Sequence, residues 1–378
     1  MAEGTKALNT LHPWAWWCWA IGIGLAVSGT MNPLLLTLLA LAVIVVVLLR
    51  RSDAPWARSV RAYLLLALFV IGMRMFFQIL LGGDTGGTVL FTLPEIPLPE
   101  WAAGISLGGP VTAEALVYTL YDGLRLSVML LCIGAANSLA NPRQALRSVP
   151  AALYEASVAV VIALSVAPQL IESAQRVRKA RRLRGDSARG LRALATVALP
   201  VLADAIDRSM ALAAGMESRG FARTRGLPVR GTLPLMLGSV GVAMLGAFLL
   251  LSTGFWQVAT TALVVGLVGT AIGLRRAGSR LAVTSYRPHP WTWRATGVAV
   301  SGVLVAALVF GLGSTDAGYA ALHPSTDPLV WPELTPLMLV AVALCLAPLP
   351  LTIPPRFAVV ETVRTDTRVR GLREGVAP

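Results

Sequence analysis

The fold is decided by two segments that begin alike and end alike, Pro168-Gln-Leu-Ile-Glu-Ser-Ala-Gln-Arg176 and Pro200-Val-Leu-Ala-Asp-Ala-Ile-Asp-Arg208. Each has leucine two residues after its proline, a carboxylate after four and arginine after eight, and each runs on to an Arg-Gly pair. Proline suits the first turn of a helix, a carboxylate four residues before an arginine supports a helix, and glycine commonly ends one. The pattern predicts two helices that start at these prolines and stop at Gly185 and Gly220. They are either two ordinary surface helices or a duplicated docking element.

The composition is that of an integral membrane protein. Of the 378 residues, 56% are hydrophobic and only 13% are charged, and the mean hydropathy is +0.70. A soluble globular protein is usually about one-quarter charged. The cysteines lie in separate apolar runs and each histidine precedes a proline, without the spacing of a disulfide framework or metal site; they are Cys18, Cys132, Cys345, His12, His289 and His323. We therefore expect no metal site and no cofactor.

Eight apolar runs approach the length of roughly 20 residues that a helix needs to cross a bilayer. They are residues 14–28, 33–49, 63–81, 111–139, 233–251, 258–274, 295–312 and 334–351. Between the third and the fourth run lies a Gly- and Pro-rich stretch, residues 82–110, which we expect to form a loop. The sequence thus predicts an all-α polytopic membrane protein with about eight transmembrane helices.

The positive charges predict how the chain is oriented. With the N-terminus in the cytoplasm, 30 of the 32 Lys and Arg residues fall on the cytoplasmic side, two lie within spans and none lies in an outer loop. By the positive-inside rule, this indicates a multi-pass protein of the cell membrane with cytoplasmic N- and C-termini. The basic stretch 141–230 then contains no net crossing. Its short apolar pieces, 156–167 and 193–202, are either feet in the bilayer or a brief re-entrant dip.

The basic stretch does not have the pattern of a nucleic-acid site. Fifteen basic residues lie between Arg143 and Arg230, interleaved with apolar helix rather than with aromatic groups on which bases stack. Attraction to anionic lipid explains part of this charge. We expect the lipid bilayer and a protein partner, and no nucleic acid.

Catalytic motifs are not evident, so we expect no catalytic residues and no enzyme activity. The chain has only two lysines, Lys6 and Lys179, and neither follows a glycine. It therefore has no P-loop of its own with which to bind ATP. No H-E-x-x-H and no paired Cys-x-x-Cys occurs either.

Three ionisable residues, Arg74, Asp122 and Arg125, lie inside predicted spans. Such residues are functional candidates by default. Because Arg125 comes three residues after Asp122, we expect these two to form a local pair on one helix. Contact with a partner subunit is the alternative for all three, and a proton relay is a weaker one.

Four short stretches carry a family resemblance: Leu11-His-Pro13, Pro142-Arg-Gln-Ala-Leu-Arg-Ser-Val-Pro150, Ala180-Arg-Arg-Leu-Arg-Gly185 and Met216-Glu-Ser-Arg-Gly-Phe221. Together they resemble the transmembrane T component of energy-coupling factor (ECF) transporters, the CbiQ/EcfT family. The resemblance covers roughly residues 11–275. The last two spans look like the C-terminal extension of some longer members.

The resemblance implies a non-catalytic subunit of an ABC-type importer. Such a subunit joins two cytosolic ABC-type ATPases to a membrane S component that binds a vitamin or a transition-metal ion. It also implies a cytoplasmic coupling-helix region whose ATPase-coupling residues are Arg184, Gly185, Glu217, Ser218, Arg219 and Gly220. Arginine suits this role because its planar guanidinium donates in a fork to carboxylates or carbonyls in a groove.

Five regions are expected along the chain. They are a four-helix transmembrane part (1–140), the coupling helices with two Arg-Gly motifs (141–230), transmembrane helices that complete the family core (231–275), a two-helix C-terminal extension (276–355) and a basic cytoplasmic tail (356–378).

A self-contained multi-pass secondary transporter or channel is the main alternative. It predicts charged or broken helices at matching positions of two halves, whereas the intramembrane charges lie only in the third and fourth spans. A membrane-embedded enzyme is a weaker alternative, because no convergent acid, base or metal set is present.

Overall fold

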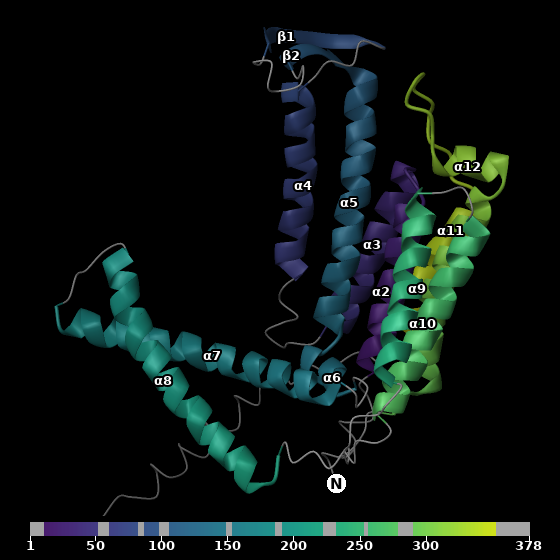
Figure 1. Cartoon of the computed structure of the whole chain (residues 1–378). Helices are drawn as coiled ribbons and strands as arrows, with labels where there is room; N and C mark the ends of the chain where they lie inside the picture. Colours follow the sequence, from purple (N-terminus) through teal and green to yellow (C-terminus); the bar gives the residue numbers. More distant parts are fainter. Residues whose placement is uncertain are drawn as a thin grey trace, which may run out of the picture. The chain divides into compact units, whose positions relative to one another are not determined.

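The computed structural model describes residues 11–51, 60–81, 87–97, 106–148, 153–185, 191–221, 232–252, 256–278 and 290–352. These residues form helices and one two-stranded sheet (Figure 1). The chain divides into two compact units, residues 1–142 with 289–378 and residues 143–288.

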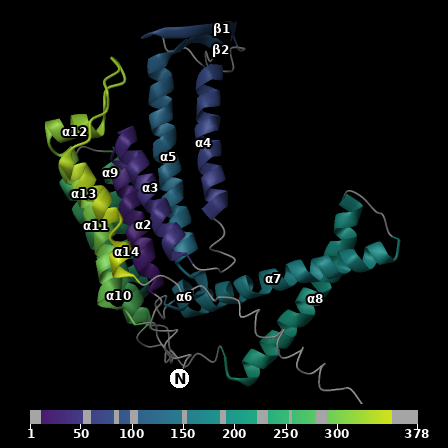
Figure 2. The same cartoon turned by 180° about the vertical axis from the view of Figure 1, so that it is seen from behind.

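The first unit is built on helices that are apolar along most of their length. They are α2 (Pro13–Ser28), α3 (Pro33–Arg50), α4 (Val60–Leu81), α5 (Ala113–Leu139), α11 (Trp293–Gly313), α12 (Asp316–Leu322), α13 (Pro336–Cys345) and α14 (Pro348–Leu351). α5 packs against α2, α3 and α4, while α11 packs on α2 and α13 on α3 (Figure 2).

The helices α2 and α11 approach most closely where two glycines meet. A Cβ atom built on Gly22 would lie 2.4 Å from the carbonyl carbon of Gly302, and one built on Gly302 would lie 2.5 Å from the Cα atom of Trp19. The Trp19 side chain is fully buried there, and its Nε1–H donates to the Cys345 carbonyl at 3.3 Å. Small residues allow such close packing in a bilayer, where van der Waals contact largely replaces water exclusion as the driving force.

Asn32 ties the α2–α3 turn to the C-terminal part of the chain. Its side chain is fully buried. Its Oδ1 accepts from the N–H groups of Leu34 (3.0 Å) and Leu35 (3.3 Å), which caps α3. Its Nδ2 donates to the carbonyls of Ala321 (2.9 Å) and Glu333 (2.8 Å). All four hydrogen-bonding positions of the amide are thus used.

A β-hairpin replaces part of the loop expected at residues 82–110. Strands β1 (Val89–Pro97) and β2 (Ser106–Thr112) pair antiparallel between α4 and α5. Valine, phenylalanine, threonine and isoleucine favour a strand in β1, a signal that the surrounding glycines and prolines hid. Because β2 runs to Thr112, α5 begins two residues later than expected.

The hairpin is fastened to the first turn of α5. The Glu114 carboxylate accepts from the Thr88 N–H at 2.9 Å and from the Thr88 hydroxyl at 3.1 Å. A carboxylate is favourable at this position because the N-terminus of a helix carries a partial positive charge.

The second unit contains two helix pairs. After the short α6 (Pro142–Arg147) come α7 (Tyr154–Leu183) paired with α8 (Leu191–Ser218), and α9 (Thr232–Ser252) paired with α10 (Trp256–Gly278). In the second pair the hydroxyls of Ser239 and Thr270 lie 3.1 Å apart across the two helices.

The prediction that helices start at Pro168 and Pro200 is wrong. Both prolines lie well inside helices, in α7 and α8 respectively. The apolar pieces 156–167 and 193–202 continue the same helices towards their N-termini. Each proline lacks the N–H that would bond the carbonyl four residues earlier, so each helix is weakened at that point.

Seven described helices are long and apolar enough to cross a membrane, against the eight expected. Six of the seven match expected runs, and the seventh is Ala156–Leu183, whose apolar part 156–167 we expected to form feet in the bilayer or a re-entrant dip without a net crossing. Two expected runs are not among the seven. Residues 14–28 lie in α2, which is a helix of only 16 residues. The last one breaks into α13 and α14 near Pro348. Within the described residues, the prediction of an all-α polytopic membrane protein is confirmed, with the hairpin as an addition.

The glycine contact predicts that Gly22→Ala is harmful and Gly24→Ala is not. The added methyl of Gly22→Ala clashes with α11 backbone, whereas a Cβ on Gly24 would meet its nearest neighbour, the Cys132 Cβ, at 4.0 Å. Overpacking of this kind costs about 1–3 kcal/mol. Thermal unfolding in detergent, followed by size-exclusion chromatography, should show a lower transition for Gly22→Ala alone. Equal transitions for the two variants would contradict the close approach.

Candidate functional site

The two Arg-Gly endings lie at the C-terminal ends of α7 and α8, which cross each other (Figure 1). α7 ends at Leu183, so that Arg184 is its cap and Gly185 follows. α8 ends at Ser218 and is followed by Arg219 and Gly220. The φ angles of Gly185 and Gly220 are 75° and 74°. Other residues adopt this left-handed conformation only with strain, which explains the glycine at both places.

Backbone hydrogen bonds close both endings, and the bond from the glycine N–H to the carbonyl three residues earlier is common to the two. The Gly220 N–H donates to the Glu217 carbonyl at 2.9 Å, and the Phe221 N–H donates to the Met216 carbonyl at 3.0 Å, as in a Schellman motif. In α7 the Gly185 N–H donates to the carbonyl three residues earlier at 3.2 Å. The prediction that both helices stop at these glycines is confirmed.

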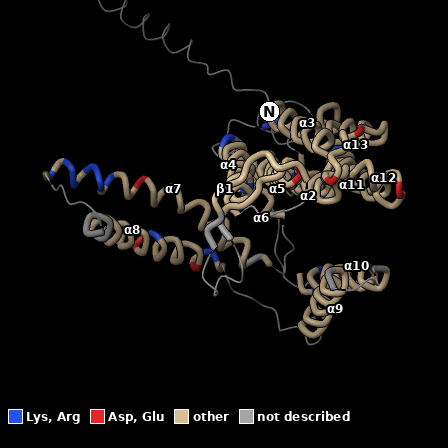
Figure 3. The backbone as a smooth tube through the Cα atoms, turned by 90° about the horizontal axis from the view of Figure 1, so that it is seen from above, with Lys and Arg blue, Asp and Glu red and all other residues tan. Residues whose placement is uncertain are grey.

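The side chains at the endings face outward. Arg184, Arg219, Glu217 and Ser218 are all exposed, and the Ser218 hydroxyl bonds back to its own helix at 3.0 Å. Basic residues gather towards the end of α7 (Figure 3); they are Arg176, Arg178, Lys179, Arg181, Arg182 and Arg184. Each ending therefore presents a guanidinium group on a backbone of defined geometry.

A hydrogen-bonded cluster at Asp204 joins α7 to α8. The Ser173 hydroxyl of α7 donates to Asp204 Oδ2 at 2.7 Å, and Ser173 is only 4% exposed. On α8, Arg208 donates from Nε to Oδ1 at 3.0 Å and from Nη2 to Oδ2 at 2.9 Å. We call these three residues the crossing cluster.

The crossing cluster favours the ionised form of Asp204. The Ser173 hydrogen bond lowers the pKa of the Asp204 carboxyl most, followed by the Arg208 hydrogen bond and by the positive charges of Arg208 and Arg176. Because the pKa of Asp204 is lower in the folded than in the unfolded chain, its ionised carboxylate makes a contribution to folding stability that is present at neutral pH. It is lost only as the pH falls through the lowered pKa.

The repeated carboxylate–arginine pattern has different outcomes in the two helices. Asp204 and Arg208 form the expected i,i+4 ion pair. Glu172 and Arg176 are both described and exposed, and no ion pair joins them. The charge of Arg176 acts on Asp204 across the helix pair instead. The similar sequence therefore forms an ion pair only in α8, whereas in α7 its arginine contributes positive charge near Asp204.

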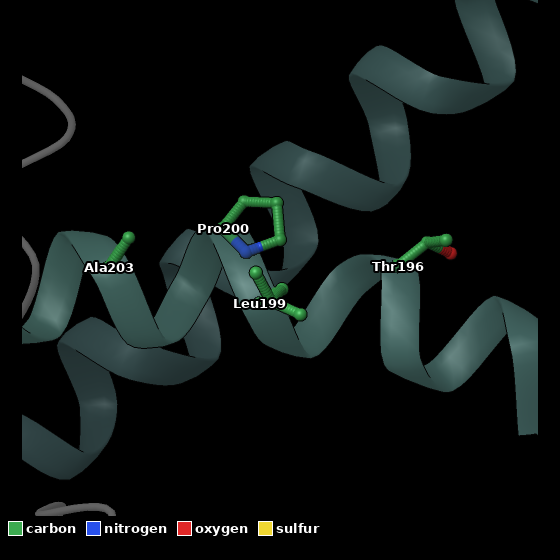
Figure 4. Close-up of a pocket in the computed structure, with 4 residues that line it drawn as sticks. All are labelled: Thr196, Leu199, Pro200 and Ala203. Carbon is green, nitrogen blue, oxygen red and sulfur yellow. The ribbon is translucent and has the colours of Figure 1, made fainter.

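An open apolar hollow lies on α8 beside its proline (Figure 4). It is lined by Thr196, Leu199, Pro200 and Ala203. None of these four side chains is ionisable, so the lining supplies no side-chain acid or base.

The intramembrane charges do not pair as expected. Asp122 forms its ion pair with Arg74 of α4 in place of Arg125 on its own helix. Arg125 instead donates to the Ser28 carbonyl at the end of α2. The helix neighbour of a charged residue competes with residues on packed helices, and here the inter-helix contacts prevail. The Arg74 side chain remains 41% exposed and that of Asp122 18%.

The described residues bear on two motifs, a metal-binding cluster and a nucleophile elbow. They contain no group of three or more His, Cys, Asp or Glu residues that could hold a metal ion. The run Gly104-Ile-Ser-Leu-Gly108 has the spacing of a nucleophile elbow, in which the serine stands on a strand-to-helix turn. Ser106 instead opens strand β2.

A family model decides the relationship. The CbiQ model, described as cobalt transport protein, matches residues 4–228. The chain belongs to this family. The matched part includes α2 to α8 with both Arg-Gly endings, so the resemblance inferred from these motifs is confirmed. None of the curated proteins compared matches the chain. The chain is thus a transport component of the membrane, and α9 to α14 lie beyond the matched residues.

Sequence reasoning missed the side chains that act between helices. Ser173 was overlooked because a serine beside a glutamate in a basic helix has no distinctive signal. Its burial depends on α8 crossing at that turn. The partners of Asn32, at Ala321 and Glu333, are equally invisible because some 290 residues separate them from it in sequence.

The positive φ angle of Gly220 predicts opposite effects for alanine substitution there, just after α8, and at Gly215 inside the helix. Gly220→Ala forces an alanine into the left-handed region and should cost about 1–2 kcal/mol locally. Gly215→Ala, inside the helix with open space around it, should instead stabilise the helix by about 0.5–1 kcal/mol. Hydrogen exchange of the last turns of α8 measures both effects. Equal protection in the two variants would contradict the left-handed stop.

Proposed function

We propose that the chain is the non-catalytic T component of an ECF-type ABC importer. It transmits the ATP-driven movement of two ATPase subunits to a membrane S component that binds the substrate. The family description makes a cobalt ion the first substrate to test; vitamins and other transition-metal ions belong to the same class of cargo. The observation that carries the proposal is the pair of exposed arginines on helix endings of matching backbone geometry.

Arginine at such an ending suits recognition of a protein groove. The left-handed glycine fixes the residue at which the helix ends, so the backbone position from which the arginine side chain extends is also fixed. Its five N–H donors lie in one plane and can form two hydrogen bonds at once to a carboxylate or to backbone carbonyls. Glu217 and Ser218 precede Arg219 on the last turn of α8 and are exposed beside it. We assign them to the same contact.

The charge distribution supports a cytoplasmic position for the endings. An arginine at the centre of a bilayer costs about 2.5–3.5 kcal/mol even on the least severe scale, and six basic residues lie from Arg176 to Arg184, five in α7 and one at its cap. We therefore place this half of α7, both endings and both termini in the cytoplasm, where two soluble ATPases are accessible. The apolar half, 156–167, then lies in or against the inner face of the cell membrane.

Reversing both charges, Arg184→Glu with Arg219→Glu, should abolish cobalt uptake in cells that express the whole transporter. Truncating a buried interfacial charge costs about 2–5 kcal/mol, and reversal adds repulsion. The matched control is Arg178→Glu with Lys179→Glu, which changes the net charge equally at exposed positions of α7. Both variants should insert to the level of the parent protein. Normal uptake by the Arg184/Arg219 variant would refute these two residues as the contacts.

Purification of the tagged chain should recover two ATPase copies, identical or homologous, for each copy of the chain. Native mass spectrometry of the detergent-solubilised complex measures this ratio. A chain that is purified alone and transports in liposomes without ATP would instead be a self-contained transporter, and the proposal would fail.

A further inference from the structure

The crossing cluster lies just beyond the weak point of each helix. Ser173 follows Pro168 by five residues, and Asp204 follows Pro200 by four. Each proline removes one backbone hydrogen bond and favours bending at its own turn. The two helices are therefore joined about one turn past their most flexible positions, on the side that leads to the Arg-Gly endings.

The joint itself is short and polar. Ser173 is nearly buried and offers a single hydroxyl, which it donates to Asp204 across the helices. Arg208 holds the same carboxylate in a two-point contact along α8, and its side chain is 44% exposed. Apolar neighbours alone allow helices to slide, whereas a hydrogen bond to a charged acceptor fixes one residue of each helix against the other.

We propose that Ser173 and Asp204 form a fulcrum that fixes where α7 and α8 cross, so that movement of one Arg-Gly ending is passed to the other. Both are positioning residues: neither touches the ATPases, and they act through Arg184 and Arg219. The inference rests on the coupling function proposed above, and it adds a site that the Arg-Gly endings do not include.

The fulcrum predicts a change in the distance between the two helix arms. Spin labels at Lys179→Cys and Ala214→Cys lie beyond the cluster on α7 and α8, at exposed positions. Cys18→Ser removes the exposed one of the three native cysteines. Pulsed dipolar spectroscopy of the full chain in lipid nanodiscs should give one narrow distance distribution for the parent protein.

Ser173→Ala and Asp204→Asn should each broaden that distribution or add a second distance. Loss of a hydrogen bond to a charged group shifts such an equilibrium roughly tenfold towards the unfixed state. The matched control is Glu172→Gln, which neutralises the equivalent carboxylate of α7 where no cross-helix bond is made. It should leave the distribution narrow. Unchanged distances in both cluster variants would overturn the fulcrum.

Transport measurements on the whole complex separate this inference from the proposed function. The Ser173→Ala complex should still contain two ATPases, but the amount of cobalt taken up per ATP hydrolysed should fall, because the endings remain bound and no longer move together. Equal uptake per ATP for Ser173→Ala and the parent would refute the fulcrum while leaving the T-component assignment standing. Absence of ATPases from the parent complex would refute the assignment itself.

Discussion

The cost of unpaired charge in a bilayer constrains this molecule more than any other single factor. The charged groups between α4 and α5 make protein contacts, as Arg74 does with Asp122 and Arg125 with the Ser28 carbonyl. Most other basic residues are concentrated in connecting stretches and in the second half of α7. Charge that pairs can be tolerated between helices, and charge that stays outside remains available for a partner. The same rule therefore explains both a stable membrane core and an exposed, strongly basic helix ending.

The C-terminal helices lie beyond the residues that match the family model, but they have a structural role in the first unit. Asn32 and Trp19, near the start of the chain, donate to carbonyls of residues after 320. Val298, Val305 and Met338 are buried with the residues of α2 and α3 in one core. Helices that make such contacts are integral to the first unit. In this member of the family, the transmembrane core thus closes through residues that follow α7 and α8 in sequence.

Local signals predicted well and long-range contacts did not, for a physical reason. Glycine at 185 and 220 stops a helix by a property of its own backbone, so sequence alone sufficed. Pro168 and Pro200 misled because proline is tolerated both at a helix start and inside a long helix, and only the neighbouring turns decide. The pairing of Asp122 with Arg74 depends on which helix lies alongside. Exposed Arg184 and Arg219 could be selected from the motif, whereas Ser173 acquires its role only through packing.

The proposed fulcrum lies at unequal distances along the helices from the two endings. Eleven residues separate Ser173 from Arg184, and fifteen separate Asp204 from Arg219; at 1.5 Å per helical residue these arms are about 16 Å and about 22 Å long. A rotation about the cluster then moves Arg219 roughly a third further than Arg184. Two ATPases that close at the same time would move the two endings by similar distances. The two arms would then have to rotate by different angles. This difference in rotation angle would tilt α7 and α8 together. Under the proposed function, an off-centre fulcrum would convert symmetric closure of two ATPases into directed movement of a single-chain subunit.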